Sequence, residues 1–270
     1  MRSIEAATCT PPAVRTKGTP AQSLALNQLH FFHLAAAVAA LMPSITQFLR
    51  MLQFGDSMLP VGSFSFSNGL EAAIAQGLVT DVASLRAFIR TALDQAAGAD
   101  GIALLAAHRA AVAGDMARIV AADHAVLLRK LNEETRTMTT RMGRKLGEMA
   151  RLVIAAPLAA QWLEHIVRQE TPGTFPVGLA LVFTASRLSE REAFAAHQYG
   201  VATMMQGAAL RLMKLNYLDG QAILHDVNGA AEGAYARIAT ADLDDMATFA
   251  PMTDILAAIH VKAHVRMFMN

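Results

Sequence analysis

Apolar residues recur every three or four positions along most of this chain, which is the period of an α-helix with one buried face. The first clear case begins after Ser44, where Ile45, Phe48, Leu49 and Leu52 fall on one side of a helix. Strict alternation of apolar and polar residues, which is typical of a half-buried strand, is nearly absent. The pattern therefore predicts an all-α protein.

Residues that start or stop helices divide this pattern into elements. They are the capping-box pairs Asn68–Glu71 and Ser189–Glu192, the helix-starting Asp81, the helix-ending Gly77, and the helix-opening Pro157 and Pro251. Residues 171–176 are expected to form a break, and the last helix is expected to run from Pro251 almost to Asn270. The sequence therefore predicts a single irregular helical bundle of roughly nine to eleven helices.

The longest expected helix covers about residues 121–153. Its apolar positions form one continuous stripe that includes Leu128, Leu131, Met138, Met142 and Met149. The opposite face carries Arg129, Arg136, Arg141, Arg144 and Arg151. A basic face of this kind is expected to be solvated or matched to an acidic partner rather than to phosphate groups.

The composition adds a surplus of apolar residues. Hydrophobic residues make up 54% of the chain and charged residues 17%, where about 25% charged is usual. The surplus indicates an interface with another chain, or a membrane. The net charge of +1 argues against a nucleic-acid binder. Cys9 is the only cysteine, which excludes an internal disulfide and is compatible with the cytosol.

Two uncharged runs, residues 18–49 and 193–210, raise the membrane question. Polar side chains interrupt both runs, whereas a spanning helix wants about 20 predominantly apolar residues, so we expect neither to cross a membrane. Residues 1–23 are rich in turn residues, and Met42 directly precedes the first amphipathic segment. We therefore expect residues 1–41 to be a disordered or dispensable extension of an all-helical domain at 42–270, with Met1 or Met42 as the start.

Motifs for catalysis and cofactors are missing. The chain contains neither a Gly-x-x-x-x-Gly-Lys-Ser/Thr phosphate loop nor a Gly-x-Ser-x-Gly nucleophile elbow. His260 and His264 lie four residues apart, so both imidazoles can face one metal ion on a helix, but no third ligand is evident. The alternative is that they belong to a polar or core face of the last helix. We expect no cofactor and no enzymatic activity.

One segment is too specific for generic packing: residues 52–73 read LQFGDSMLPVGSFSFSNGLEAA. Further short motifs follow it at Glu134-Thr135-Arg136, Met142-Gly143-Arg144, Pro176-Val177-Gly178, Arg211-Leu212, Asp219-Gly220-Gln221, Ala250-Pro251, Asp254-Ile255, His260 and Arg266-Met267-Phe268. In this order, and over about residues 42–270, the motifs resemble the UreF family of urease accessory proteins. The chain departs from the family pattern at 214–218 and at Val261.

The resemblance implies an all-α, cytoplasmic, non-enzymatic chaperone. Such proteins form dimers, join the accessory protein UreD (UreH in some bacteria) and recruit the GTPase UreG, so that nickel reaches the urease apoprotein. The positions that match the family motifs, and are expected to bind partners, are Asp56, Ser57, Pro60, Gly62, Phe64, Phe66, Ser67, Gly69, Glu71, Arg211, Gly220, Gln221, His260, Arg266 and Phe268. Two alternatives remain: an all-α ligand-binding regulator and a membrane-associated helical protein.

Two expectations concern aromatic residues in these motifs. Phe64 and Phe66 are two positions apart, so in an extended loop one side chain can enter the core while the other faces a neighbour. The chain ends in large apolar side chains that would be a sticky patch in water. We expect this tail to dock on a partner through Arg266 and Phe268, the alternative being that it packs on the chain's own core.

Overall fold

The computed structural model describes residues 43–56, 58–247, 250–260 and 266–268, and these residues form helices and connecting loops without a strand. The α-helices are α2 Ile45–Gly55, α3 Leu70–Ala75, α4 Val82–Ala96, α5 Ile102–Ala113, α6 Met116–Leu128, α7 Glu133–Met149, α8 Pro157–Val167, α9 Phe175–Ala185, α10 Glu190–Leu212, α11 Tyr217–Gly229, α12 Ala231–Ile238 and α13 Pro251–His260. Short 3-10 or π turns are η1 Ser63–Ser65, η2 Ala97–Gly101, η3 Ala150–Ile154 and η4 Leu243–Asp245. The all-α prediction is confirmed.

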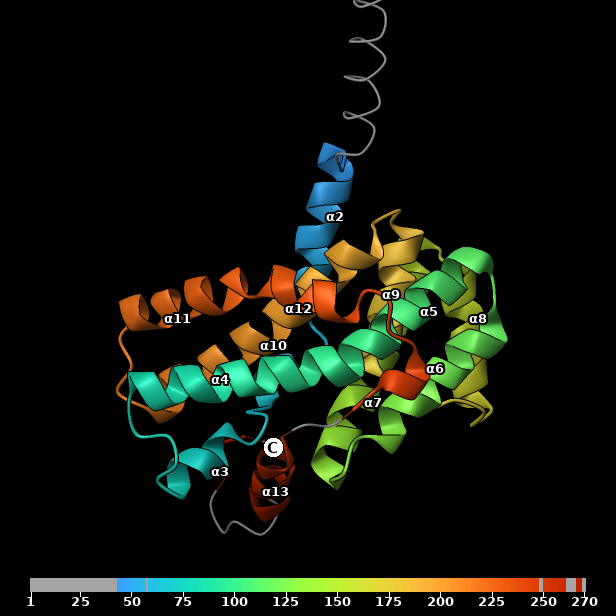
Figure 1. Ribbon diagram of the computed structural model, residues 1–270. Helices are drawn as coiled ribbons and strands as arrows, with labels where there is room; N and C mark the ends of the chain where they lie inside the picture. The colour runs from blue at the N-terminus through green and yellow to red at the C-terminus, as the bar shows by residue number, and fades with distance from the viewer. Residues whose placement is uncertain (1–42, 57, 248–249, 261–265, 269–270) are drawn as a thin grey trace, which may run out of the picture. The chain divides into compact units, whose positions relative to one another are not determined.

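Helices α5 to α9 form one part of the bundle (Figure 1). Every residue of α9 from Pro176 to Phe183 is buried, because this helix is apolar on all sides and has neighbours all round it. Helices α5 and α7 pack directly against α9, and α6 and α8 cover the outside. Trp162 of α8 and Leu146 of α7 are fully buried in this first core.

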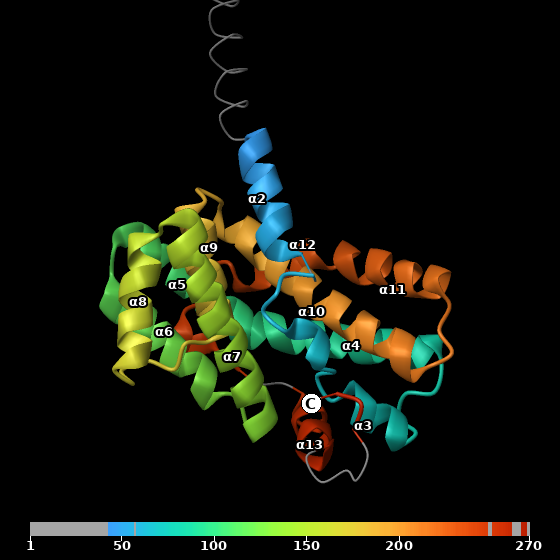
Figure 2. The ribbon, with the colours of Figure 1, turned by 180° about the vertical axis from the view of Figure 1, so that it is seen from behind.

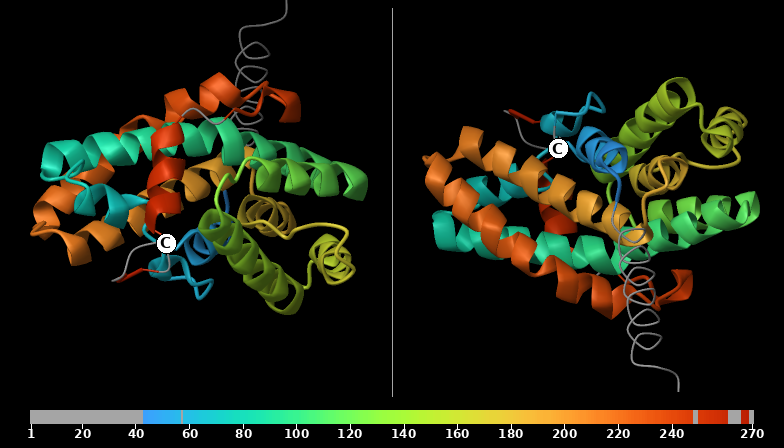
Figure 3. Two further views of the ribbon diagram at one scale, coloured as in Figure 1. Left: turned by 90° about the horizontal axis from the view of Figure 1, so that it is seen from below. Right: turned by 90° about the horizontal axis from the view of Figure 1, so that it is seen from above.

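Helices α4, α10 and α11 run side by side in the other part, with α3 and α13 across one side of them (Figures 1 and 3). Their shared core, the second core of the bundle, contains Leu85 and Ile89 of α4, Met205 of α10 and Ile223 of α11. The long helix α10 joins the two parts, because Phe194 near its start is buried in the first core.

A buried carboxylate, Asp123 of α6, fixes the loop that leads into α9. Its side chain is inaccessible to solvent and accepts hydrogen bonds of 2.5–2.9 Å from five donors. These are the indole N–H of Trp162, the hydroxyls of Thr171 and Thr174, and the backbone N–H groups of Gly173 and Thr174. Because a buried carboxylate is costly unless it is well hydrogen-bonded, the loop conformation and Asp123 depend on each other.

Helix α7 lies against the same loop, at Gly143. A Cβ atom at this position would overlap the backbone carbonyls of Gly173 and Thr174. Only glycine permits this approach, so Gly143 brings α7 close to α9.

Most helix boundaries agree with the local sequence signals. Asp81 and Ser84 form a capping box at the start of α4, and Ser189 and Glu192 form another at the start of α10. Gly77 follows α3 with a φ of 71°. The two helix-opening prolines are the first residues of α8 and α13.

The single central helix is a wrong prediction. The segment divides into α6 and α7, and the side chain of Asn132 caps α7 by accepting a hydrogen bond of 2.8 Å from the backbone N–H of Thr135. Leu128 and Leu131 are therefore exposed at the break, and the buried stripe starts only at Thr135.

Three smaller predictions also fail. The N-cap of α3 is Gly69, and no capping box joins Asn68 to Glu71. Pro176 does not break the chain but lies in the first turn of α9. The last described helix ends at His260, and residues 266–268 are not helical.

Residues 1–42 lie outside the described residues, so the proposed extension and its boundary remain predictions. Among the residues that the structure describes, no helix is long and apolar enough to cross a membrane.

Candidate functional site

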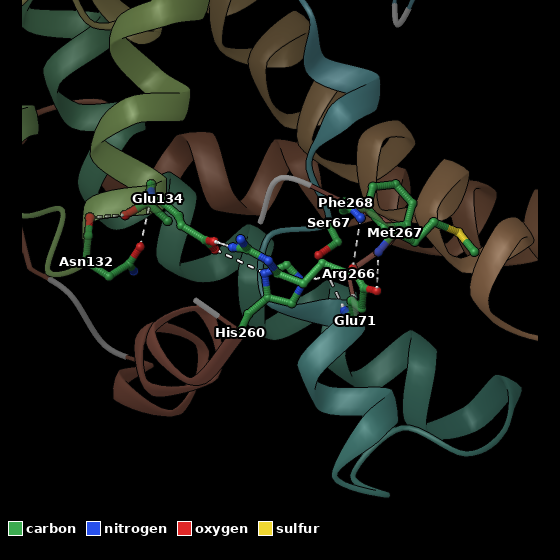
Figure 4. Close-up of polar contacts among 9 residues, drawn as sticks. Ser67, Glu71, Asn132, Glu134, His260, Arg266, Met267 and Phe268 are labelled. Carbon is green, nitrogen blue, oxygen red and sulfur yellow. Dashed lines mark hydrogen bonds and ion pairs between the residues drawn. The ribbon is translucent and has the colours of Figure 1, made fainter. Parts of the chain in front are cut away.

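Several of the family-motif residues meet around the carboxylate of Glu71 in α3 (Figure 4). One oxygen of Glu71 accepts a hydrogen bond of 2.8 Å from the backbone N–H of Met267. The other accepts a hydrogen bond of 3.0 Å from the backbone N–H of Phe268 and lies 2.9 Å from Nε2 of His260. This carboxylate therefore holds both α13 and the C-terminal residues.

The imidazole of His260 is buried between two carboxylates. Its Nδ1 lies 3.2 Å from Oε2 of Glu134, on the side opposite Glu71. Both ring nitrogens of His260 therefore have a carboxylate oxygen within hydrogen-bonding distance.

Glu134 carries the network into α7. Its second oxygen accepts a hydrogen bond of 3.0 Å from Nη1 of Arg266. Glu134 stands in the first turn of α7, where the helix dipole favours a negative charge. The contacts of Glu71 and Glu134 thus tie together α3, α7, α13 and the segment 266–268. We call this network of Glu71, Glu134, His260 and residues 266–268 the tail clamp (Figure 4).

Arg211 of α10 joins the tail to the loop before α3. Its guanidinium carbon lies 4.3 Å from the centre of the Phe268 ring, within the range of a cation–π contact. The same guanidinium donates a hydrogen bond of 2.8 Å to the backbone carbonyl of Phe64. The Phe268 ring is only 4% exposed and belongs to the second core.

The burial of Phe268 corrects the expectation for the tail. Its ring packs on the chain's own core, which was the alternative, rather than being presented to a partner. Arg266 likewise has an internal acceptor in Glu134. Met267 between them is 60% exposed and, of the tail residues that the structure describes, is the apolar side chain that remains available.

The loop before α3 is shaped by two glycines with positive φ. Gly62 has a φ of 92° and precedes η1, and Gly69 has a φ of 80° and precedes α3. A Cβ atom at Gly69 would lie 3.1 Å from the carbonyl oxygen of Thr253, so this glycine lets α13 pack closely. Phe66 is 4% exposed and Phe64 is 65% exposed, the division that their spacing predicts, although a 3-10 turn rather than an extended loop produces it.

The structure brings only part of the predicted set together. Glu71, Arg211, His260, Arg266 and Phe268 form the tail clamp and its contact with α10. Other family-motif residues lie elsewhere: Asp56 accepts a hydrogen bond from the backbone N–H of Met58, Pro60 is exposed, Gly220 packs against Gln206, and Gln221 is exposed on α11. Ser67 is buried beside the clamp, where its hydroxyl oxygen accepts a hydrogen bond of 3.4 Å from the backbone N–H of Glu71 (Figure 4). Ser57 lies outside the described residues.

The metal hypothesis concerns His260 and His264. Both ring nitrogens of His260 face carboxylates in this arrangement, and His264 lies outside the described residues. No group of three or more potential ligands suited to a metal ion occurs in the part of the chain that the structure describes.

Two residues of functional or structural weight were missed. Glu134 stood within a motif that resembles the family but was not selected as a site residue; its place just after the helix-capping Asn132 was the available signal. Asp123 gave no sequence signal, because its donors are neutral and lie about 40–50 residues away.

A separate feature is the apolar surface of α2 and α10. Ile45, Phe48, Leu49 and Leu52 of α2 are exposed, and so are Tyr199 and Leu210 of α10. Met51 and Leu52 also line a groove of about 390 Å³ with Ala195, Ala196 and Tyr199. This surface accounts for part of the apolar surplus in the composition.

Comparison with known proteins decides the family. The UreF family model matches residues 79–228, more than half of the chain. The chain belongs to the UreF family. It is 58% identical over 227 residues to urease accessory protein UreF 2 of Brucella canis, which covers 84% of this chain and 93% of the relative. It is 57% identical over 227 residues to UreF 1 of Brucella melitensis, covering 84% and 94%.

A more distant UreF, that of Yersinia enterocolitica, is 50% identical over 222 residues, covering 82% of this chain and 97% of the relative. The UreF model and its named relatives together confirm the resemblance to urease accessory proteins.

Proposed function

We propose that this UreF chain is a non-enzymatic, cytoplasmic chaperone that joins UreD (UreH) and recruits the GTPase UreG, so that nickel is inserted into the urease apoprotein. Nickel is cargo in this proposal and is not a resident cofactor. The observation that carries it is the tail clamp, which brings residues from both ends of the family motif set into one network. Both carboxylates and both ring nitrogens of His260 have partners inside the network, so its product is a shaped surface rather than a reactive centre.

The proposed UreD-binding surface lies beside the clamp. Arg211 binds the Phe64 carbonyl and stacks on Phe268, so it fixes the loop and the tail next to each other. The side chains of Phe64 and Met267 nevertheless remain exposed. Large apolar side chains held by a rigid support are typical of interface anchors.

We assign the apolar surface of α2 and α10 to a homodimer. Tyr199 and Leu210 are eleven residues apart, which places them on the same side of α10. A self-complementary contact needs an apolar ridge and a recess on each copy, and the exposed face of α2 and the adjoining groove supply both. Leu52→Glu is expected to convert the dimer to a monomer, measured by analytical ultracentrifugation.

The experiment for the main proposal is binding of purified UreD to wild-type and variant chains, followed by addition of UreG and a urease activation assay in cells. Phe64→Ala and Met267→Ala are expected to weaken UreD binding by about tenfold or more, as anchor truncations do. Val112→Ala, at an exposed apolar residue of α5, a helix that contributes no residue to the tail clamp, is the matched control. Wild-type affinity in both anchor variants would refute the assigned surface.

The proposal that the chain is not an enzyme is tested by a separate measurement. The purified chain, incubated with GTP and with nickel, is expected to release no phosphate, because it lacks a phosphate loop. Release of phosphate at a steady rate by the chain alone would contradict it.

A further inference from the structure

The outward face of α7 carries positive charge that internal contacts leave largely unpaired. Arg141, Arg144 and Lys145 are exposed at helical spacing, and Arg151 follows in η3. Arg144 lies 3.4 Å from the carboxylate of Glu148, a solvated contact within one helix. Among the described residues the other three side chains make no ion pair.

The structure separates these residues from the rest of the predicted basic face. Arg129 donates hydrogen bonds to the carbonyl oxygens of Met246 and Leu243, at 3.0 and 3.3 Å. Arg136 donates one of 2.7 Å to the carbonyl oxygen of Lys130. Both therefore hold chain segments in place, and of the predicted basic face Arg141, Arg144 and Arg151 remain available to another molecule, together with Lys145.

Two aliphatic side chains stand next to these cations. Leu152 and Val153 are 75% and 63% exposed in the π turn η3. The turn is followed by Ala155 with a φ of 55°, a conformation that costs a non-glycine residue about 1 kcal/mol or more. Solvation explains the charged side chains, but it does not explain a strained turn that exposes Leu152 and Val153. π turns of this kind often occur at functional positions.

The face continues toward the loop before α3. Nζ of Lys145 is 3.7 Å from the point where a Cβ atom of Gly62 would lie, so this side chain reaches over the loop that carries the exposed Phe64. A partner seated on Phe64 would therefore meet Lys145 first and the arginines beyond it. Figure 2 shows α7 with α8 beside it, on the left of the view.

We propose that the α7–η3 face, defined as Arg141, Arg144, Lys145, Arg151, Leu152 and Val153, binds an acidic surface on the partner that docks at Phe64. In the proposed function, on which this inference rests, that partner is UreD. Arginine side chains bind carboxylates through two parallel hydrogen bonds, and Leu152 and Val153 fill an apolar depression between the carboxylates. A protein fits better than a nucleic acid, because the chain's net charge is only +1 and the face includes Glu148 and two aliphatic side chains.

The test is the affinity of the full chain for purified UreD at about 50 and 300 mM salt, a range over which screening of exposed charges increases. The charge-reversal variant is Arg141→Glu/Arg144→Glu/Lys145→Glu. At low salt we expect it to bind at least tenfold more weakly than wild type. We also expect the wild-type affinity to fall with added salt and the variant's affinity to change little or to rise.

A second variant, Leu152→Ser/Val153→Ser, tests the apolar part. It is expected to lose affinity severalfold while keeping the wild-type salt dependence. The matched control is Arg168→Glu/Arg191→Glu/Arg237→Glu, which makes the same charge change at exposed arginines just after α8, in α10 and in α12, and should bind UreD as the wild type does. If the charge-reversal variant does not fold, the corresponding glutamine variant replaces it, with a smaller loss expected.

The outcomes separate this inference from the proposed function. If wild-type chain does not bind UreD at all, the proposed function fails. A different result would overturn only the present inference: the wild type binds UreD, Phe64→Ala weakens that binding, and both α7–η3 variants bind UreD as the wild type does. If the charge-reversal variant loses binding to a duplex DNA or RNA probe that the wild type binds, while its UreD binding is unchanged, the face belongs to nucleic acid. That result would also overturn the present inference.

Discussion

Two carboxylate networks join distant segments of this chain, and they differ in their donors and in their burial. Asp123 is inaccessible to solvent and accepts five hydrogen bonds, all from neutral groups. Glu71 and Glu134 keep 14% and 10% of their side-chain surface. They share the imidazole of His260, and they accept hydrogen bonds from the guanidinium of Arg266 and from two backbone amides.

The two networks differ in how much of the fold must move before a donor can leave its carboxylate. The donors to Asp123 belong to α8 and to the loop before α9, inside the first core, so they cannot leave without disrupting the fold. Two backbone donors to Glu71 come from residues 267 and 268, in a short described segment that belongs to no helix. The Asp123 network is therefore part of the folding unit, whereas the tail clamp is an attachment whose loss leaves most of the bundle intact.

The largest expected effect is that of breaking the Asp123 network. Asp123→Ala removes the acceptor of five buried donors, and leaving buried donors unpaired costs about 1–3 kcal/mol for each group that water cannot reach. We expect a loss of at least about 3 kcal/mol in the free energy of unfolding, measured by urea denaturation. The control Thr171→Val removes a single donor and should cost about 1 kcal/mol. A loss below that of Thr171→Val would show that the loop does not depend on the carboxylate.

The tail clamp should give a smaller and more local effect. Glu71→Gln keeps an acceptor but loses the charge that faces His260, so the free energy of unfolding should fall by only about 1 kcal/mol. Hydrogen exchange at the amides of Met267 and Phe268 should accelerate by about tenfold or more, while amides in α9 exchange as in the wild type. Equal acceleration in α9 would mean that the clamp and the first core unfold together.

The pH dependence of stability is expected to come from two buried histidines that belong to neither carboxylate network. Burial lowers the pKa of His197, and burial also lowers the pKa of His108. The unfolded chain then binds protons more readily than the folded chain, so stability is retained above about pH 6.5 and decreases as the pH falls below it. His197→Gln should reduce this slope, by at most about 1.4 kcal/mol per pH unit, in melts between pH 7 and pH 5. An unchanged slope would exclude His197 as its source.

The smallest effect should come from the outer pair of the clamp. Arg266 is 41% exposed, so its interaction with Glu134 is screened by water. A double-mutant cycle of Arg266→Ala and Glu134→Gln should give a coupling energy below about 1 kcal/mol. A coupling of several kcal/mol would place this pair with Asp123 as part of the folding unit.

Local signals account for most of the fold. The capping residues Asp81 and Ser189 act within four residues of themselves, so their helices could be located from the sequence. The division between α6 and α7 was missed because residues 129–131 contain neither glycine nor proline, and the apolar spacing continues through them. Asn132 was the one local sign of a new helix.

The site was less predictable, because its contacts join residues far apart in sequence. Glu71 has the spacing of a capping residue, but its carboxylate binds His260, 189 positions later. The resemblance to UreF selected Glu71, Arg211 and His260 individually without showing that they meet. The tail's own packing could not be derived either, since an apolar terminus fits an interface and a core equally well.

The contact at Gly143 has a consequence for how this lineage can change over generations. Every single-base change that replaces this glycine adds a Cβ atom, and that atom would overlap the carbonyls of Gly173 and Thr174. A second substitution elsewhere cannot relieve the overlap, because the obstructing atoms are backbone. Helix α7 can therefore exchange its outward side chains freely while its position against α9 is inherited unchanged, so new partner surfaces can evolve on α7 without refolding the bundle beneath it.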